Sequence, residues 1–284
     1  MTLSKTRKAW LTLPAFVALG SISAVHAAGE PLNSLKITEV VQKVDVISAA
    51  SKKQTAAQRN GTFNVPDLLT TGADSRAEMV AADGTVTRVG SNTIFSFSAD
   101  KREARLEKGS VLFNSPTGKG GGIIRSASAS AAVLGTSIIV TATKNGGFKL
   151  LVLEGKAKAT LPNGKSTSLE AGQLSFVMPG STGFGPVIEF RLMNQVATSN
   201  LVRGFKAPLP SLGKITAATK RQEKKIAQGG AEATTEMVES PAIYSPRIRM
   251  DFVNSIGEQS KFGRKSLSEF FSNHHHQGNF QGPL

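Results

Sequence analysis

The chain has 284 residues, with 34 Lys and Arg against 20 Asp and Glu, so its formal net charge is +14 at pH 7. That length suits one medium domain with extensions, or two small domains. Because the sequence contains no Cys, it excludes disulfide bonds, thiolate metal sites and lipid-modified cysteines.

Residues 1–27 are typical of a secretory signal peptide. Basic residues precede a short apolar run at 10–19, and the residues around His26 permit cleavage after Ala27. An uncleaved anchor is the alternative, but Pro14 interrupts the run, which is shorter than the roughly 18 residues that a membrane-spanning helix needs. We therefore predict an exported protein, periplasmic or secreted, that does not span a membrane after cleavage.

Residues 28–60 begin with a loosely alternating stretch at 35–47, which predicts one or two N-terminal strands followed by a linker. From Gly61 onward, apolar residues alternate with polar ones, and turns rich in Gly and Asp separate them. We therefore assign residues 61–193 to a β domain.

The centre of this β domain contains three short apolar runs, at 132–140, 148–153 and 174–177. Asn-Gly pairs at 145–146 and 163–164 separate such runs, and Asn-Gly suits the tight turns of hairpins because it tolerates positive φ. The pattern predicts a series of consecutive antiparallel hairpins. The Phe residues of the domain are expected in its core: Phe63, Phe95, Phe97, Phe113, Phe148 and Phe176.

The strand pattern ends near residue 193, and we predict a connector and a basic helix over residues 194–230. The helix is expected at 212–228, with Ser211 as its N-cap and Gly229 after its end. Its apolar stripe is thin, which predicts light packing or none. Residues 231–284 are rich in Ser, Asn, Gln and Gly, a composition typical of a mostly disordered tail.

Sites for nucleophiles, metals and cofactors are scarce in this sequence. The β domain contains no His and no Cys, which excludes Ser-His and Cys-His arrangements there. His274, His275 and His276 stand near the chain end, but a flexible tail offers no preorganised cage, so we predict no metal site. We also predict no cofactor, because the Gly-rich stretch 116–122 lacks the spacing of a phosphate-binding loop.

Carboxylate pairs are the remaining candidates for acid–base catalysis, either Asp74 with Glu78 or Glu78 with Asp83. Asp beside Gly is usually a turn residue, and Glu in an alternating strand usually faces solvent. We therefore predict no catalytic residues and no enzyme, with a carboxylate-dependent hydrolase as the least favoured alternative. One basic cluster is expected to be a solvated hairpin: Lys101, Arg102, Arg105 and Lys108.

Short motifs containing Gly recur in order between residues 61 and 177. They are Thr71-Gly72 with Ala77, Asp83-Gly84, Gly109, Gly135-Thr136, Glu154-Gly155 and Gly172. In this order they resemble the FecR-like domain of bacterial envelope proteins. The resemblance implies an all-β, non-catalytic domain of stacked antiparallel strands, a solenoid or a sandwich, in which these residues have structural roles only.

The best-known FecR-like proteins contact the signalling domain of an outer-membrane transporter in the periplasm and pass the signal to a sigma factor. No cytoplasmic anti-sigma segment precedes the domain here, so we expect a free-standing exported relative. Our leading hypothesis is a module of the bacterial envelope that binds a protein partner or senses a signal. Cleavage would leave a charge of about +11, which favours, as an alternative, an electrostatic binder of anionic envelope polymers rather than of a specific nucleic acid.

Overall fold

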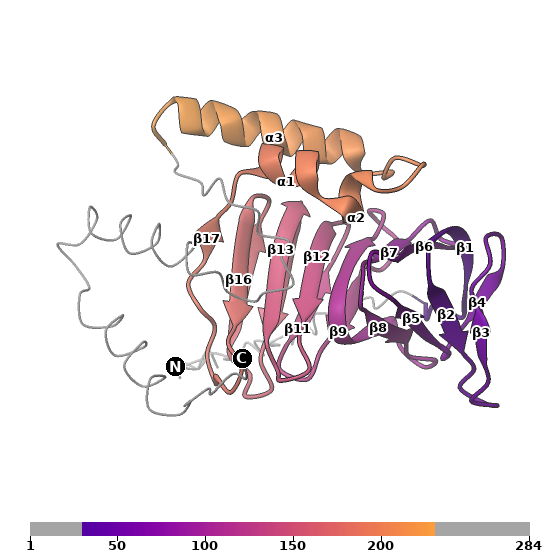
Figure 1. Ribbon diagram of the computed structural model, residues 1–284. Coiled ribbons are helices and arrows are strands. Elements are labelled where there is room, and N and C mark those ends of the chain that lie inside the picture. Colours follow the sequence, from indigo (N-terminus) through magenta and orange to yellow (C-terminus); the bar gives the residue numbers. More distant parts are fainter. Residues whose placement is uncertain (1–29, 231–284) are drawn as a thin grey trace, which may run out of the picture.

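The computed structural model describes residues 30–230. The predicted signal peptide and the predicted disordered tail, with its three His residues, lie outside this part of the chain. Two β-sheets stacked on one another form the body of the protein, and helices cover one of them (Figure 1). The predicted all-β fold, given as a solenoid or a sandwich with a basic helix after it, is confirmed in its strand content and its helix.

The sheet that carries the helices is called sheet A, and the other is called sheet B. Sheet A contains, in spatial order, β4 (Thr62–Asn64), β1 (Ser34–Val41), β6 (Arg76–Ala81), β7 (Val86–Val89), the second half of β9 (Glu103–Asn114), β12 (Ser137–Ala142), β13 (Phe148–Glu154), β16 (Gln173–Val177) and β17 (Ile188–Glu189). Sheet B contains β3 (Gln54–Ala56), β2 (Val44–Ile47), β5 (Leu68–Thr71), β8 (Ile94–Phe97), the first half of β9, β10 (Gly122–Arg125), β11 (Ser130–Val133), β14 (Lys156–Thr160) and β15 (Ser166–Glu170).

Strand β9 belongs to both sheets. Its first half pairs with β8 and β10 in sheet B, and its second half pairs with β7 and β12 in sheet A. The strand turns at Gly109, whose φ is +96°. The pairing of β9 with β10 is parallel, whereas the other strand pairs of the described chain are antiparallel.

Consecutive hairpins alternate between the two sheets. The β10–β11 hairpin lies in sheet B, the β12–β13 hairpin in sheet A and the β14–β15 hairpin in sheet B. The predicted series of hairpins is therefore confirmed, and Gly146 and Gly164 occupy two of the turns with positive φ. The run at 132–140 is not one strand, however, because the chain changes sheets at Leu134 and splits the run into β11 and β12.

The main hydrophobic core lies between the two sheets. Side chains from sheet A, such as Met79 and Val140, meet side chains from sheet B, such as Leu69 and Ile124. All six Phe residues predicted to be core are buried; Phe176 lies in the second core, under the helices, and the others lie between the sheets.

Three helices cover the outer face of sheet A as a third layer (Figure 1). They are α1 (Leu192–Thr198), α2 (Asn200–Arg203) and α3 (Leu212–Ala227). The prediction of a plain connector before the basic helix was therefore wrong. The prediction that the basic helix packs lightly was also wrong, because Ile215 is fully buried and Ala218 is nearly so against sheet A.

The apolar sequences of β12 and β13 explain this third layer. Every residue of both strands is buried, so both faces of these strands must be covered. One face meets sheet B, and the other, through Ile139, Leu151 and Leu153, meets the helices. A continuous apolar run indicates a strand covered on both sides, whereas simple alternation indicates one covered side.

Candidate functional site

The motif residues singled out from the sequence lie mainly where the chain passes from one sheet to the other. Thr71 ends β5 in sheet B, Gly72 follows it before β6 in sheet A, and Gly109 is the corner of β9. The other crossings contain Gly135 and Thr136 (β11 to β12), Glu154 and Gly155 (β13 to β14), and Gly172 (β15 to β16). Ala77 lies in β6, and Asp83 and Gly84 lie in the turn between β6 and β7.

Side-chain hydroxyl groups fasten two of these crossings. Thr71 Oγ1 donates to the carbonyl oxygen of Gly90 at 2.6 Å and accepts from the backbone N–H of Thr93 at 2.9 Å. Thr136 Oγ1 donates to the carbonyl oxygen of Lys156 at 2.9 Å. These contacts give buried or half-buried backbone groups near the crossings a hydrogen-bond partner.

Glu154 joins sheet A to the start of α3 through Ser137. The Ser137 hydroxyl bonds both the Glu154 carboxylate, at 3.1 Å, and the Ser211 hydroxyl, at 2.7 Å. Ser211 is the N-cap residue of α3, as predicted, but its side chain makes no cap bond to the helix. Burial raises the pKa of Glu154, whereas the hydrogen bond from Ser137 and the charge of Lys214 oppose that rise.

Neither of the two candidate carboxylate pairs forms in the structure, because Glu78 and Asp83 each bind an arginine instead. Glu78 accepts from Arg88 Nε at 2.8 Å and from Thr38 Oγ1 at 2.7 Å, and it is 5% exposed. The expectation that Glu78 faces solvent was wrong, because the segment after α2 covers this part of sheet A. Asp83 pairs instead with Arg102, and Asp74 is exposed at the start of β6.

The prediction that the basic cluster of residues 101–108 is wholly solvated was wrong for Arg102. Its side chain is buried and donates to the Asp83 carboxylate, to the carbonyl oxygens of Gly121 and Glu30, and to Thr85 Oγ1. Burial would raise the pKa of Asp83, but hydrogen bonds from Thr85 and Arg102 outweigh it and hold that pKa below its usual value. The other three cluster residues are exposed or half-buried.

Arg88 is the centre of a contact that we call the helix clasp. Its guanidinium donates to the carbonyl oxygens of Leu201 at 3.0 Å, Val202 at 2.7 Å and Ala207 at 2.5 Å. The same group lies 4.5 Å from the centroid of the Phe205 ring. Arg88 therefore holds the C-terminal carbonyls of α2 and the following segment onto sheet A.

The clasp is completed by contacts at its margin. Arg76 Nε donates to the carbonyl oxygen of Gly204 at 2.6 Å, and the Glu39 carboxylate accepts from the backbone N–H of Lys206 at 2.9 Å. Burial lowers the pKa of Arg88, and its hydrogen bond with Glu78 opposes that effect. An arginine remains charged under such a shift, since its unperturbed pKa is far above neutral pH.

Sequence reasoning assigned Arg88 no partner and no role, although a signal for its pairing was present. The turn at Asp83-Gly84 sets the register of the β6–β7 hairpin, which places Glu78 opposite Arg88. Opposite charges facing one another across a hairpin indicate a pair. What the sequence could not show is that α2 covers this pair.

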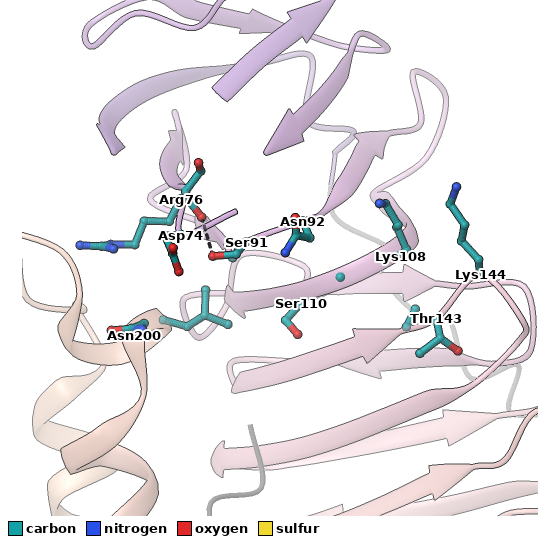
Figure 2. A pocket seen from close by; sticks show the side chains of 14 residues that line it. Asp74, Arg76, Ser91, Asn92, Lys108, Ser110, Thr143, Lys144 and Asn200 are labelled. Atoms are coloured by element: carbon teal, nitrogen blue, oxygen red, sulfur yellow. Dashed lines mark hydrogen bonds between the residues drawn. The ribbon is translucent and has the colours of Figure 1, made fainter. Parts of the chain in front are cut away.

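A groove of about 480 Å³ lies beside the clasp, at the end of the sandwich where β9 changes sheets. In Figure 2 the side chains of Lys108 and Lys144 point to the same side at one end of the groove. Asp74 and Arg76 lie toward its other end, where α2 forms part of the wall. The polar lining includes Ser91, Asn92, Ser110, Thr143 and Asn200.

The groove is cationic. Lys108 and Lys144 supply two positive charges, and Asp74 is the one acidic residue in its lining. Arg76 also lines the groove, but its guanidinium is bonded to the carbonyl oxygen of Gly204 and lies 5.7 Å from the centroid of the Phe205 ring. Among the salt bridges of residues 30–230, none involves Lys108, Lys144 or Asp74. These groups are therefore available to charges on a ligand.

Two further features concern membranes and metals. No helix between residues 30 and 230 has both the length and the apolar composition to cross a membrane. In the same part of the chain, no group of three or more His, Cys, Asp or Glu residues could hold a metal ion.

Comparison with known proteins confirms the FecR resemblance. Residues 67–158 match the family model described as FecR protein, which covers the segment from β5 to β14. Residues 67–158 therefore resemble a FecR domain. No curated protein matches it.

Two crystal structures of a candidate anti-sigma factor from Parabacteroides distasonis ATCC 8503 are similar to this chain. The first is 20% identical, with a TM-score of 0.39, over 43% of this chain and 59% of that structure. The second is 17% identical, with a TM-score of 0.40, over 46% of this chain and 64% of that structure. The chain thus spans less than two thirds of the length of either structure.

Proposed function

We propose that this chain is an exported FecR-domain protein that works without catalysis, as an interaction or signal-sensing module of the bacterial envelope. The groove beside the helix clasp receives its protein partner. One observation carries the proposal: the residues that charge the groove, from Asp74 to Lys144, all lie within the segment that matches the FecR family model. The groove is thus a feature of the FecR domain itself, to which α2 adds one wall.

The bonding of the acidic residues supports a role without catalysis. Glu78 and Asp83 are each engaged by an arginine, and they lie in separate ion pairs. A general base must be within reach of a substrate proton, and a carboxylate enclosed by a structural partner is poorly placed for that task. The export signal proposed at residues 1–27 supports a location in the bacterial envelope.

Partner capture from the groove tests this proposal. A photo-crosslinking residue is placed at Asn92, which is exposed in the groove, and the full chain is expressed with its native N-terminus. We expect ultraviolet light to yield an adduct with an envelope protein, because a bound partner would lie against this position. The adduct is identified by gel shift and mass spectrometry.

Two other positions serve as controls. Lys53 is exposed in the loop between β2 and β3, and Ser168 is exposed on β15, an edge strand of sheet B. An adduct from Ser168 but not from Asn92 would assign the contact to strand addition at the sheet edge. The absence of an adduct at both Asn92 and Ser168 would contradict the proposed interaction module. Equal adducts at Asn92 and Lys53 would contradict it as well.

A second candidate function is the electrostatic binding of anionic envelope polymers. The outer face of α3 supports it, since Lys220, Arg221 and Lys224 are exposed on one helix and form none of the salt bridges in the described chain. Neighbouring like charges without counter-charges create a positive potential that attracts polyanions.

Retention on an anionic column tests this second function. We expect the protein to bind heparin-agarose at low salt and to elute as salt rises, because exposed charges are screened over about 10 Å at 0.1 M salt. The triple variant Lys220→Gln, Arg221→Gln, Lys224→Gln should elute at clearly lower salt. Its matched control removes three other exposed positive charges, at Lys36, Lys52 and Lys53. Equal shifts for both variants would show that net charge alone controls retention, with no binding face on α3.

A further inference from the structure

The groove has a distribution of charge that restricts what it can bind. Its charges are not evenly spread, because Lys108 and Lys144 share one end while Asp74 stands toward the other (Figure 2). Arg76 stands beside Asp74, but its guanidinium extends away from the lysine end and is bonded to the carbonyl oxygen of Gly204. A ligand that fits must therefore carry negative charge opposite the lysines and no negative charge opposite Asp74.

This asymmetry argues against a uniformly charged polymer. A polyphosphate or a regularly charged polysaccharide would place one of its anions beside Asp74, and like charges in contact cost binding energy. The lining also contains no aromatic side chain on which a sugar ring or a nucleic-acid base could stack.

The polar lining suits an extended peptide backbone. Asn92 and Asn200 bring side-chain amides to the lining, and each amide can both donate and accept. A backbone in extended form presents N–H and C=O groups in alternation, which amides and hydroxyls can pair. The volume of about 480 Å³ admits a short segment rather than a folded domain.

We infer that the groove binds a short, extended, acidic segment of a partner protein. Its acidic side chains pair with Lys108 and Lys144, and its neutral end lies beside Asp74. This inference rests on the proposed function, since it names the chemistry that the partner brings to the same groove.

A second consequence concerns the helix layer. Asn200 and Leu201 of α2 line the groove, and the carbonyl oxygen of Leu201 is held by Arg88 at 3.0 Å. The clasp therefore fixes one wall of the groove in place. A preformed wall reduces the ordering that a bound segment must otherwise induce.

Fluorescence anisotropy with a labelled peptide tests the inference. The peptide is Gly-Gly-Ser-Glu-Ser-Glu-Ser-Gly, and the comparison peptide has Gln in place of both Glu residues. We expect the protein to bind the Glu peptide and to lose roughly tenfold in affinity toward the Gln peptide. Binding should weaken further as salt rises, because the lysines are partly solvated.

Charge reversal locates the binding. Lys108→Glu and Lys144→Glu should each reduce affinity for the Glu peptide by roughly tenfold. The control Lys158→Glu makes the same charge change at an exposed position on β14 and should leave affinity within about twofold. Circular dichroism confirms that all three variants are folded.

Several outcomes would overturn the inference. Equal affinity for the two peptides would show that the groove does not select an acidic peptide. An equal effect of all three charge reversals on affinity would show that the peptide does not bind at the groove. Polyphosphate could instead bind at Lys108 and Lys144 and displace the peptide at a far lower concentration than the peptide needs to bind. That result would assign the groove to an anionic polymer rather than to an acidic peptide. A crosslinked partner at Asn92 together with failed peptide binding would retain the proposed function and reject only the acidic chemistry.

Discussion

Replacing Arg88 with Ala is expected to lower the free energy of unfolding by about 3–5 kcal/mol, as removal of one member of a buried ion pair does. The guanidinium is fully buried, and its loss leaves the Glu78 carboxylate without a charged partner at 5% exposure. The carbonyl oxygens of Leu201, Val202 and Ala207 lose their donor in the same step.

Urea denaturation followed by far-ultraviolet circular dichroism measures this effect. Arg203→Ala is the matched control, because Arg203 is exposed and donates to a nearby helix carbonyl, that of Val196, at 3.0 Å. The control should change stability by no more than about 0.5 kcal/mol. Arg88→Lys should remain strongly destabilising, because a lysine cannot reproduce the planar fork that reaches several acceptors.

The double variant Glu78→Gln, Arg88→Ala separates the two causes of the lost stability, which are the unpaired Glu78 carboxylate and the backbone carbonyls that lose their donor. If the unpaired carboxylate dominates, Glu78→Gln should recover a large part of the loss, since it removes the buried charge. If the orphaned carbonyls dominate, the double variant should be as unstable as Arg88→Ala. A loss below about 1 kcal/mol for Arg88→Ala would show that the clasp contributes no more than one ordinary hydrogen bond to stability.

The strands and turns could be predicted because their signals are local. Asn145-Gly146 and Asn163-Gly164 occupy turns that join antiparallel strands, and both glycines have positive φ. The Phe residues mark the core because large apolar side chains are buried in nearly every fold. These features depend on neighbours in the sequence.

The assignment of strands to sheets could not be predicted, because it depends on distant pairings. Gly135, Thr136 and Ser137 interrupt the run at 132–140, but they do not reveal that its halves pair with β14 in sheet B and with β9 and β13 in sheet A. The helix layer was missed for a similar reason. The apolar stripe of α3 is thin, and Ile215 and Ala218 become a core only because β12 and β13 offer an apolar outer face.

The candidate site lay beyond sequence reasoning for a geometric reason. Its charged residues come from the start of β6, the corner of β9 and the β12–β13 turn, and α2 closes one side. Lys108 was expected only as part of a solvated cluster, and Lys144 was not singled out. The pairing of β9 with both sheets places them side by side.

Gly109→Ala is expected to be the second strongly destabilising change, at about 3 kcal/mol or more, because it combines backbone strain with overpacking. At φ +96° an L-residue is strained, and an added Cβ would lie 2.5 Å from Thr93 Cα and 2.6 Å from Thr93 Cβ. Thr93 cannot move freely, since its N–H is bonded to Thr71 Oγ1.

Gly146→Ala separates strain from crowding. Gly146 has φ +89°, and an added Cβ would meet nothing within 4 Å, so only the strain of about 1–2 kcal/mol applies. Urea denaturation of both variants measures the difference. A greater loss at Gly109 by about 1 kcal/mol or more would show that the close approach of Thr93 contributes to the need for glycine at this corner. Equal losses of stability in the two variants would mean that positive φ alone requires glycine at position 109. Thr93 would then move to accommodate the added methyl group.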